Sequence, residues 1–136
     1  MAVEITVTYQ GDLRCDAQHG PSKARLTTDA PVDNQGKGES FSPTDLVATA
    51  LGTCMLTIMG IVAQRHDIAL KGATVKVEKH MVADPARRIG RLPVTISVPG
   101  KLDAQQRKLL MAAADGCPVH KTLGERVEMP ITWQWA

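Results

Sequence analysis

The chain has 136 residues, a length that suits one domain with its own hydrophobic core. Hydrophobic residues make up 43% of the chain and aromatic residues only 3%, so we expect an aliphatic core. The net charge is +2, and the scattered basic residues form no stripe with interleaved aromatics of the kind that binds nucleic acid. We therefore predict a single domain over residues 1–136 without a nucleic-acid partner.

The N-terminal part of the chain carries three β patterns. "VEITVTY" alternates apolar and polar residues over 3–9, and after the turn signal "GD" the stretch "LRCDAQ" returns as the second strand of a hairpin. A third strand, "ARLTTDAP", is followed by a polar loop of a length often found around sites. No positively charged start or apolar core of a signal peptide precedes these strands, which favours a cytoplasmic location.

A long helix is predicted by "SPTDLVATALGTCMLTIMGIVAQRHD". Ser42 suits the N-cap, Pro43 the first helical position, and Asp45 the first turn, where a carboxylate complements the helix dipole. Apolar residues cover nearly all faces, which predicts a central helix buried on most sides. The stretch approaches the length of a membrane span, but its threonines and glycines favour a core helix and no membrane partner.

The second half of the chain mixes strands and helices. "ATVKVEKHMV" (73–82) and "LPVTISVPG" (92–100) are predicted strands joined by the turn or hairpin connection "ADPARRIGR". A helix over 103–114, a short helix over "CPVHKTLG" and a last strand follow, and Pro130 implies that this strand lies at an edge or bulge. The order βββ–α–ββ–αα–β predicts the α+β class.

Cys15, Cys54 and Cys117 are the three cysteines. Without a CxxC motif there is no local thioredoxin-type dithiol, and three cysteines do not form a secreted disulfide framework. Cys54 lies in the middle of the long helix, where a cysteine is most often a small buried hydrophobe. Cys15 lies in the first hairpin with no motif around it, so a structural role is expected.

Cys117 is harder to interpret because it precedes Pro118 and therefore suits the N-cap of the short helix. The free N–H groups at a helix start favour an anion, which predicts a lowered pKa for this thiol. His120 shares its helix face, but no second ligand pair supports a metal site, and a surface position is expected for this histidine. From the residues alone, Cys117 remains a cap, half of a disulfide, a ligand or a working thiol.

Two motifs in order, "SPTDLVATALGTCMLTIM" and "ADGCPVHKTL", resemble the OsmC/Ohr family of osmotically inducible and organic hydroperoxide resistance proteins, in its general OsmC-like redox branch. The resemblance spans nearly the whole chain. It implies an OsmC/Ohr-like α+β fold in which two antiparallel sheets pack around a long buried central helix. It also implies an intertwined homodimer with active sites at the subunit interface.

The activity that the resemblance implies is thiol-dependent reduction of organic hydroperoxides to alcohols, without metal, flavin or haem. Cys54 matches the family's peroxidatic cysteine, whose thiolate attacks the O–O bond and becomes a sulfenic acid. Cys117 matches the resolving cysteine, which condenses with that sulfenic acid to an intramolecular disulfide. A dithiol reductant, of lipoyl type or a small thiol, would then restore both thiols.

One part of the family pattern is missing. The family stabilises its peroxidatic thiolate with an arginine that is held by a glutamate early in the central helix, whereas this chain has Thr44 in that place and its acid, Asp45, one residue later. Arg14 and Arg25 are the candidate arginines, and Arg14 is preferred. Since a thiol in mid-helix gains little from the helix terminus, Cys54 needs such a cation. The expected catalytic set is Cys54, Cys117, Arg14 and Asp45.

Two other functions remain open. The chain could bind or hydrolyse a small acyl-type ligand in the same interfacial apolar pocket, without peroxidase turnover. It could also be a structural or interaction domain whose cysteines are passive. Peroxide consumption, a co-purified ligand and the titration of the thiols distinguish these hypotheses.

Overall fold

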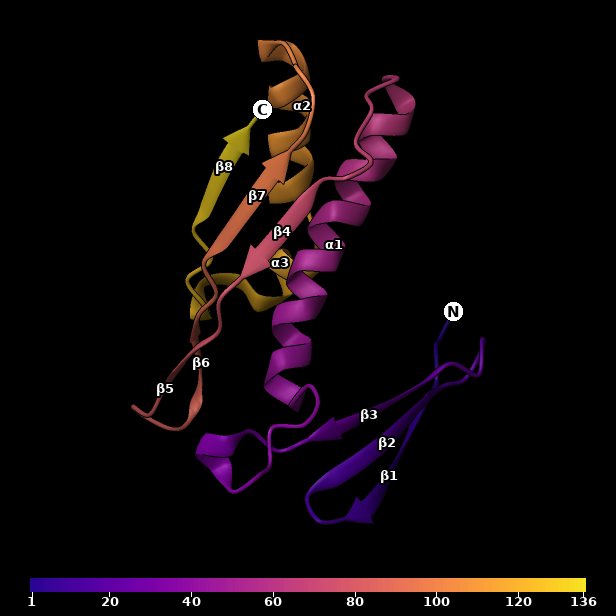
Figure 1. The fold of residues 1–136 in the computed structure, drawn as a ribbon, viewed down its shortest axis with the longest axis vertical. Helices are drawn as coiled ribbons and strands as arrows, with labels where there is room; N and C mark the ends of the chain where they lie inside the picture. Colours follow the sequence, from indigo (N-terminus) through magenta and orange to yellow (C-terminus); the bar gives the residue numbers. More distant parts are fainter. The chain divides into compact units, whose positions relative to one another are not determined.

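A computed structural model describes residues 1–136, with eight β-strands and three α-helices (Figure 1). The α+β class and the long central helix predicted from the sequence are both confirmed. Residues group by their contacts into two compact units, Met1–Leu46 and Val47–Ala136, and each is described by itself below.

The first unit is built on an antiparallel sheet of β1 (Ile5–Gly11), β2 (Arg14–His19) and β3 (Arg25–Asp29), in that order. The predicted hairpin and third strand are therefore confirmed. Asp12 and Leu13 form the turn between β1 and β2 with φ values of 54° and 62°. Two successive positive φ values give a two-residue turn whose twist matches that of the flanking strands.

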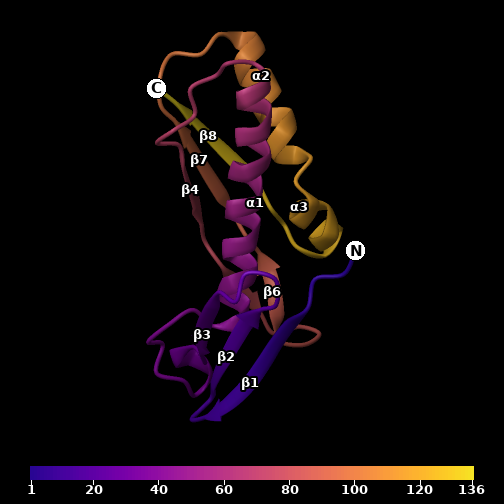
Figure 2. The same ribbon diagram turned by 90° about the vertical axis from the view of Figure 1, so that its right-hand side faces the viewer.

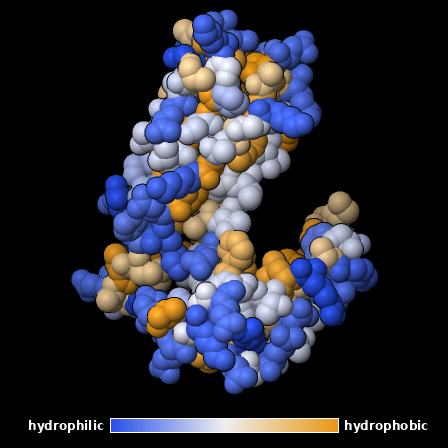
Figure 3. Space-filling model, viewed as in Figure 1, coloured by the Kyte–Doolittle hydropathy of each residue, from blue (hydrophilic) through white to orange (hydrophobic).

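One face of this sheet is apolar and exposed. Side chains alternate along a strand, so Ile5, Val7 and Tyr9 share a face, and the pairing of Val7 and Leu26 with Ala17 places Leu26 on it too. These four side chains are from 46% to 64% exposed. Figure 3 shows hydrophobic side chains at the surface among polar ones. Nothing else within the first unit covers this face of the sheet.

The loop from β3 to the first helix contains a short 3₁₀ turn, Val32–Asn34, and is tightened by Gly36. The Gly36 N–H donates to the Pro31 carbonyl at 3.0 Å, and a Cβ at Gly36 would overlap the carbonyl oxygen of Ala30. The loop can close in this way only because residue 36 has no side chain.

Gly36→Ala is expected to lower the free energy of unfolding by about 2 kcal/mol, since the added methyl group displaces backbone. Urea denaturation measures the effect. Lys37→Ala, an exposed change in the same loop, is the control and is expected to stay within about 0.5 kcal/mol of the parent. Equal stabilities of the two variants would contradict the description of this loop.

The central helix α1 (Pro43–Arg65) begins where the sequence predicts. The Ser42 hydroxyl accepts the Asp45 N–H at 3.1 Å, and the Ser42 N–H donates to the Asp45 carboxylate at 2.9 Å. This reciprocal pair is a capping box, which satisfies backbone groups that the first turn leaves unbonded.

The burial of α1 follows one stripe, formed by Leu51, Met55, Met59 and Ala63 at intervals of four residues. Ile61, on another face, is 42% exposed. The prediction of a helix buried on most sides is therefore wrong for the single chain, because its own sheet and helices cover only one face. By length and composition α1 could also cross a membrane, a property that core helices share.

Three strands of the second unit form a mixed sheet in the order β4 (Thr74–Val77), β7 (Val94–Val98), β8 (Ile131–Trp135). β4 pairs with β7 antiparallel, whereas β8 pairs with β7 parallel. The predicted antiparallel pairing holds for β4 and β7 but is wrong for β8, because the helical connection from β7 to β8 is long enough to return the chain in the same direction. The edge position of β8 agrees with Pro130 directly before it.

A separate two-stranded sheet pairs β5 (His80–Val82) with β6 (Arg88–Arg91). The sequence predicted one continuous strand through β4 and β5, and a connection where β6 lies. The fold thus contains three sheets, two of them antiparallel throughout, rather than the two predicted from the resemblance.

Helices α2 (Ala104–Asp115) and α3 (Pro118–Leu123) follow β7. Figures 1 and 2 show α1 and α2 on the same side of the mixed sheet, so this unit has a layer of helices and a layer of strands. Trp133 and Trp135 of β8 stack with ring centroids 5.0 Å apart, and the guanidinium of Arg107 lies 5.1 Å from the Trp135 ring. The core between the layers is aliphatic, as predicted, and its buried members are Ala48, Leu51, Met55, Met59, Ala63, Ile68, Leu92, Val94, Ile96, Val98, Leu110, Ala113, Ala114 and Cys117.

Candidate active site

Two cysteines of the second unit lie near each other, Cys117 within its core and Cys54 packed against that core. Cys54 lies in the middle of α1 and is half-buried, whereas Cys117 precedes α3 and is completely buried. Cys54 packs against the cluster that contains Cys117 and lies near enough to raise the pKa of the Cys117 thiol. The structure thus brings together the two thiols that the resemblance pairs, and both are free cysteines.

Cys117 is the N-cap of α3, as the sequence predicts, with Pro118 in the first helical position. Its sulfur accepts the His120 N–H at 3.5 Å. Burial raises the pKa of the Cys117 thiol, the neighbouring Cys54 raises it further, and the N–H groups of His120 and Val119 lower it. The prediction of a lowered pKa is wrong, because loss of hydration outweighs what one short helical turn can offer an anion.

The raised pKa of Cys117 predicts a pH effect on stability. The folded chain holds this proton at pH values where the unfolded chain releases it, so the contribution of Cys117 is fully present below its ordinary pKa of 9.0 and is lost as the pH rises through the raised value. We expect the free energy of unfolding to fall more steeply above about pH 9 in the parent than in Cys117→Ser. Urea denaturation under reducing conditions measures both slopes, and equal slopes would contradict this assignment.

Of the four histidines, only His120 has a contact with this pair. His19, His66 and His80 are exposed. His120 is half-buried rather than on the open surface, and its backbone N–H is the group that contacts the Cys117 sulfur.

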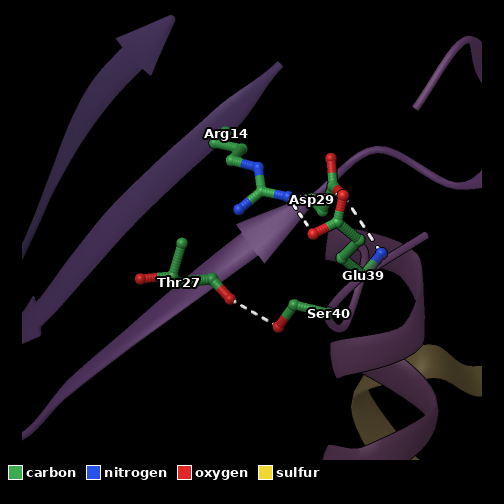
Figure 4. Close-up of polar contacts among 5 residues, drawn as sticks. All are labelled: Arg14, Thr27, Asp29, Glu39 and Ser40. Carbon is green, nitrogen blue, oxygen red and sulfur yellow. Dashed lines mark hydrogen bonds and ion pairs between the residues drawn. The ribbon is translucent and has the colours of Figure 1, made fainter. Parts of the chain in front are cut away.

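Arg14 lies in the first unit, on β2 opposite Asp29 of β3. Its Nη2 atom is 3.0 Å from the Glu39 carboxylate and 3.4 Å from the Asp29 carboxylate (Figure 4). The hydrogen bond that Arg14 donates to the Glu39 carboxylate, followed by the charges of Glu39 and Asp29, raises the pKa of Arg14. The other candidate, Arg25, is 63% exposed and lies 3.9 Å from Asp16.

The sequence did not identify Asp29 and Glu39 as residues of interest. The available signals were weak ones, namely an aspartate closing the buried end of a strand and a glutamate in the polar loop expected near a site. Asp45, which the sequence placed in the catalytic set, contacts Ser42 as part of the helix cap. Cys15 is half-buried and pairs across the sheet with Tyr9 and Thr28.

Comparison with known proteins gives one family and a consistent set of folds. The model of the family described as OsmC-like protein matches residues 36–132. A proposed osmotic stress induced and detoxification response protein from Psychrobacter arcticus 273-4 has a similar solved structure, with 45% identity and a TM-score of 0.92 over 98% of this chain and 97% of that one. No functionally curated protein matches the chain.

More distant solved structures share the fold. An OsmC like protein from Mycoplasma pneumoniae is 15% identical with a TM-score of 0.84, over 100% of this chain and 98% of that one. An organic hydroperoxide resistance protein OsmC from Legionella pneumophila is 16% identical with a TM-score of 0.79, over 98% of this chain and 97% of that one.

Proposed function

Because the chain belongs to the OsmC-like family, we propose that it is a thiol-dependent peroxidase that reduces organic hydroperoxides to alcohols. The observation that carries the proposal is the placement of Cys54 against the aliphatic core that contains Cys117, near enough to influence the Cys117 thiol. Two neighbouring thiols can pass between a reduced state and a disulfide, which is the chemistry that a peroxide substrate needs. Distant relatives named as organic hydroperoxide resistance proteins give further support.

Cys54 is the proposed peroxidatic residue and Cys117 the resolving one. Burial raises the pKa of the Cys117 thiol, which suits a residue that reacts after Cys54 rather than with the substrate. Cys54 is also the more exposed of the two, which suits the residue that meets substrate first.

The steps balance as a two-electron reduction. The Cys54 thiolate attacks the O–O bond of the hydroperoxide, an S–O bond forms, and the alkoxide leaves and takes a proton as the alcohol. The Cys117 sulfur then attacks the Cys54 sulfenic acid, the S–S bond forms, and hydroxide leaves with the Cys117 proton as water. An external dithiol, of lipoyl type or a small thiol, reduces the disulfide, and a reducing compartment such as the cytoplasm supplies one.

The aliphatic surroundings favour an alkyl hydroperoxide over hydrogen peroxide. Cys54 belongs to the half-buried apolar side chains packed against the core, as do Ile58, Val119 and Leu123. Arg14 is proposed as the cation that supports the Cys54 thiolate, and Asp45, in the first turn of α1, as the acid that completes the catalytic set. The reaction as proposed uses no metal, flavin or haem.

The proposed assembly is a homodimer. Its support is the uncovered apolar face of the β1–β3 sheet and the exposed apolar side of α1, which a second copy would bury. Val7→Glu is expected to give a monomer in sedimentation velocity, whereas Thr8→Glu, on the opposite face of β1, leaves the parent's dimer intact. A parent that sediments as a single chain would contradict the proposal.

Mass spectrometry after one equivalent of cumene hydroperoxide tests the proposed reaction. We expect the loss of two hydrogen atoms, mapped to a Cys54–Cys117 disulfide that dithiothreitol reverses. Cumyl alcohol should form in equal amount. Unchanged thiols and unconsumed peroxide, with a small acyl-type molecule retained in native mass spectra, would favour the ligand-binding alternative instead.

A further inference from the structure

Two carboxylates from different segments of the first unit converge on one nitrogen of Arg14. Glu39 comes from the loop before α1, Asp29 from the end of β3, and both approach Nη2, at 3.0 Å and 3.4 Å (Figure 4). A guanidinium presents three nitrogen atoms in a rigid plane, so holding one of them orients the other two.

Asp29 is unusual because it is a carboxylate with 1% of its surface exposed. Its Oδ2 atom also accepts the Glu39 N–H at 3.1 Å, and its own N–H donates to the Phe41 carbonyl at 3.1 Å. Its Oδ1 atom is buried without a hydrogen-bond partner. Burying a charge is unfavourable unless it is paired and hydrogen-bonded, so the Asp29 carboxylate depends on the Arg14 guanidinium and the Glu39 N–H for its stability in this place.

The start of α1 cannot supply the same contact through Thr44. Thr44 stands where the family resemblance expects a glutamate, and its hydroxyl lies 3.2 Å from that of Ser42. A hydroxyl carries no charge, and it lacks the paired oxygens with which a carboxylate fixes a guanidinium plane.

We propose that Asp29 and Glu39 are the positioning residues of Arg14, and that together they take the place of the missing helix glutamate. This inference rests on the proposed function, in which Arg14 supports the Cys54 thiolate. Asp29, rigid and buried, fixes where the guanidinium lies, and Glu39, which is 57% exposed, sets its orientation. Neither residue touches the reacting atoms, so both act through Arg14.

The same sheet offers a matched control in the pair of Arg25 and Asp16. It joins β3 to β2 as the Arg14–Asp29 pair does, but at 3.9 Å and with Arg25 63% exposed. Exposed ion pairs of this kind contribute little, and Asp16→Asn is expected to leave activity unchanged.

The test compares Glu39→Gln, Glu39→Asp, Asp29→Asn and Asp16→Asn in the full chain, with cumene hydroperoxide and a dithiol reductant. We expect kcat/KM to fall about fivefold in Glu39→Gln and tenfold or more in Asp29→Asn, because a misplaced catalytic group loses effectiveness steeply. Glu39→Asp, which keeps the carboxylate, should retain most of the parent's kcat/KM. Glu39→Gln added to Arg14→Ala should cause no further loss, since a residue that acts only through Arg14 has nothing left to position.

Four outcomes separate the inference from the proposed function. If Arg14→Ala is impaired while Glu39→Gln and Asp29→Asn match the parent, the inference is overturned and the peroxidase stands. The inference is also overturned, with the peroxidase intact, if Glu39→Gln weakens the Arg14→Ala variant further. If the parent consumes no peroxide, the inference is tested by the rate at which iodoacetamide alkylates Cys54. Equal slowing of this alkylation in Arg14→Ala and Glu39→Gln supports the inference. Alkylation rates that match the parent's in both variants overturn it. If Asp29→Asn does not fold, the exposed Glu39 variants carry the test alone.

Discussion

Replacing Cys54 with serine is expected to slow hydroperoxide reduction by about 1,000-fold or more. A serine hydroxyl stays protonated at neutral pH and cannot become a sulfenic acid, so both the attack on the O–O bond and the later disulfide are lost. The measurement is the disappearance of cumene hydroperoxide at equal concentrations of parent and variant, with dithiothreitol as reductant.

Cys15→Ser is the matched control for this prediction. Cys15 is also a half-buried free cysteine, but it lies on β2 in the first unit, and the proposed reaction gives it no role. It should keep the parent's rate. A Cys54→Ser variant as fast as the parent, or a Cys15→Ser variant as slow as Cys54→Ser, would refute the assignment of the peroxidatic residue.

Cys117→Ser is expected to have the second largest effect, a loss of about 100-fold in turnover with a dithiol, while the first reaction with peroxide remains. Serine is nearly isosteric and is a favoured N-cap, so the start of α3 should survive the change. The Cys54 sulfenic acid then has no neighbouring thiol with which to condense. Dimedone, which labels sulfenic acids, should accumulate on Cys54 of this variant.

The parent protein is the reference for the dimedone experiment, because its sulfenic acid should be consumed by Cys117 before the label reacts. If Cys117→Ser turned over as fast as the parent, the reductant would be attacking the sulfenic acid directly. Cys117 would then be a buried cap rather than a resolving residue.

The sequence correctly predicted those helix starts and strands that depend on interactions between residues close together in the chain. Ser42 and Pro43 located the start of α1, and Cys117 was correctly identified as the N-cap of α3. The alternating strands of the first unit also formed as predicted. In each case hydrogen bonds or side-chain alternation within a few residues determine the element.

Features that depend on distant neighbours could not be predicted in this way. The parallel pairing of β8 depends on where α2 and α3 return the chain, which no local pattern encodes. The pKa of Cys117 depends on burial and on Cys54, so its position at a helix start suggested the wrong direction. The ion pairs of Asp29 and Glu39 with Arg14 could be recognised only in the folded structure, which places the three side chains together.

The stacked pair Trp133 and Trp135 gives the two units separate optical reporters. These are the only tryptophans in the chain, and both lie in β8 of the second unit, whereas the single tyrosine, Tyr9, lies in β1 of the first. Tryptophan fluorescence therefore follows the melting of the mixed sheet, and tyrosine absorbance follows that of the N-terminal sheet. Coincident curves from the two signals would identify a single cooperative transition, and displaced curves would reveal that the units melt independently.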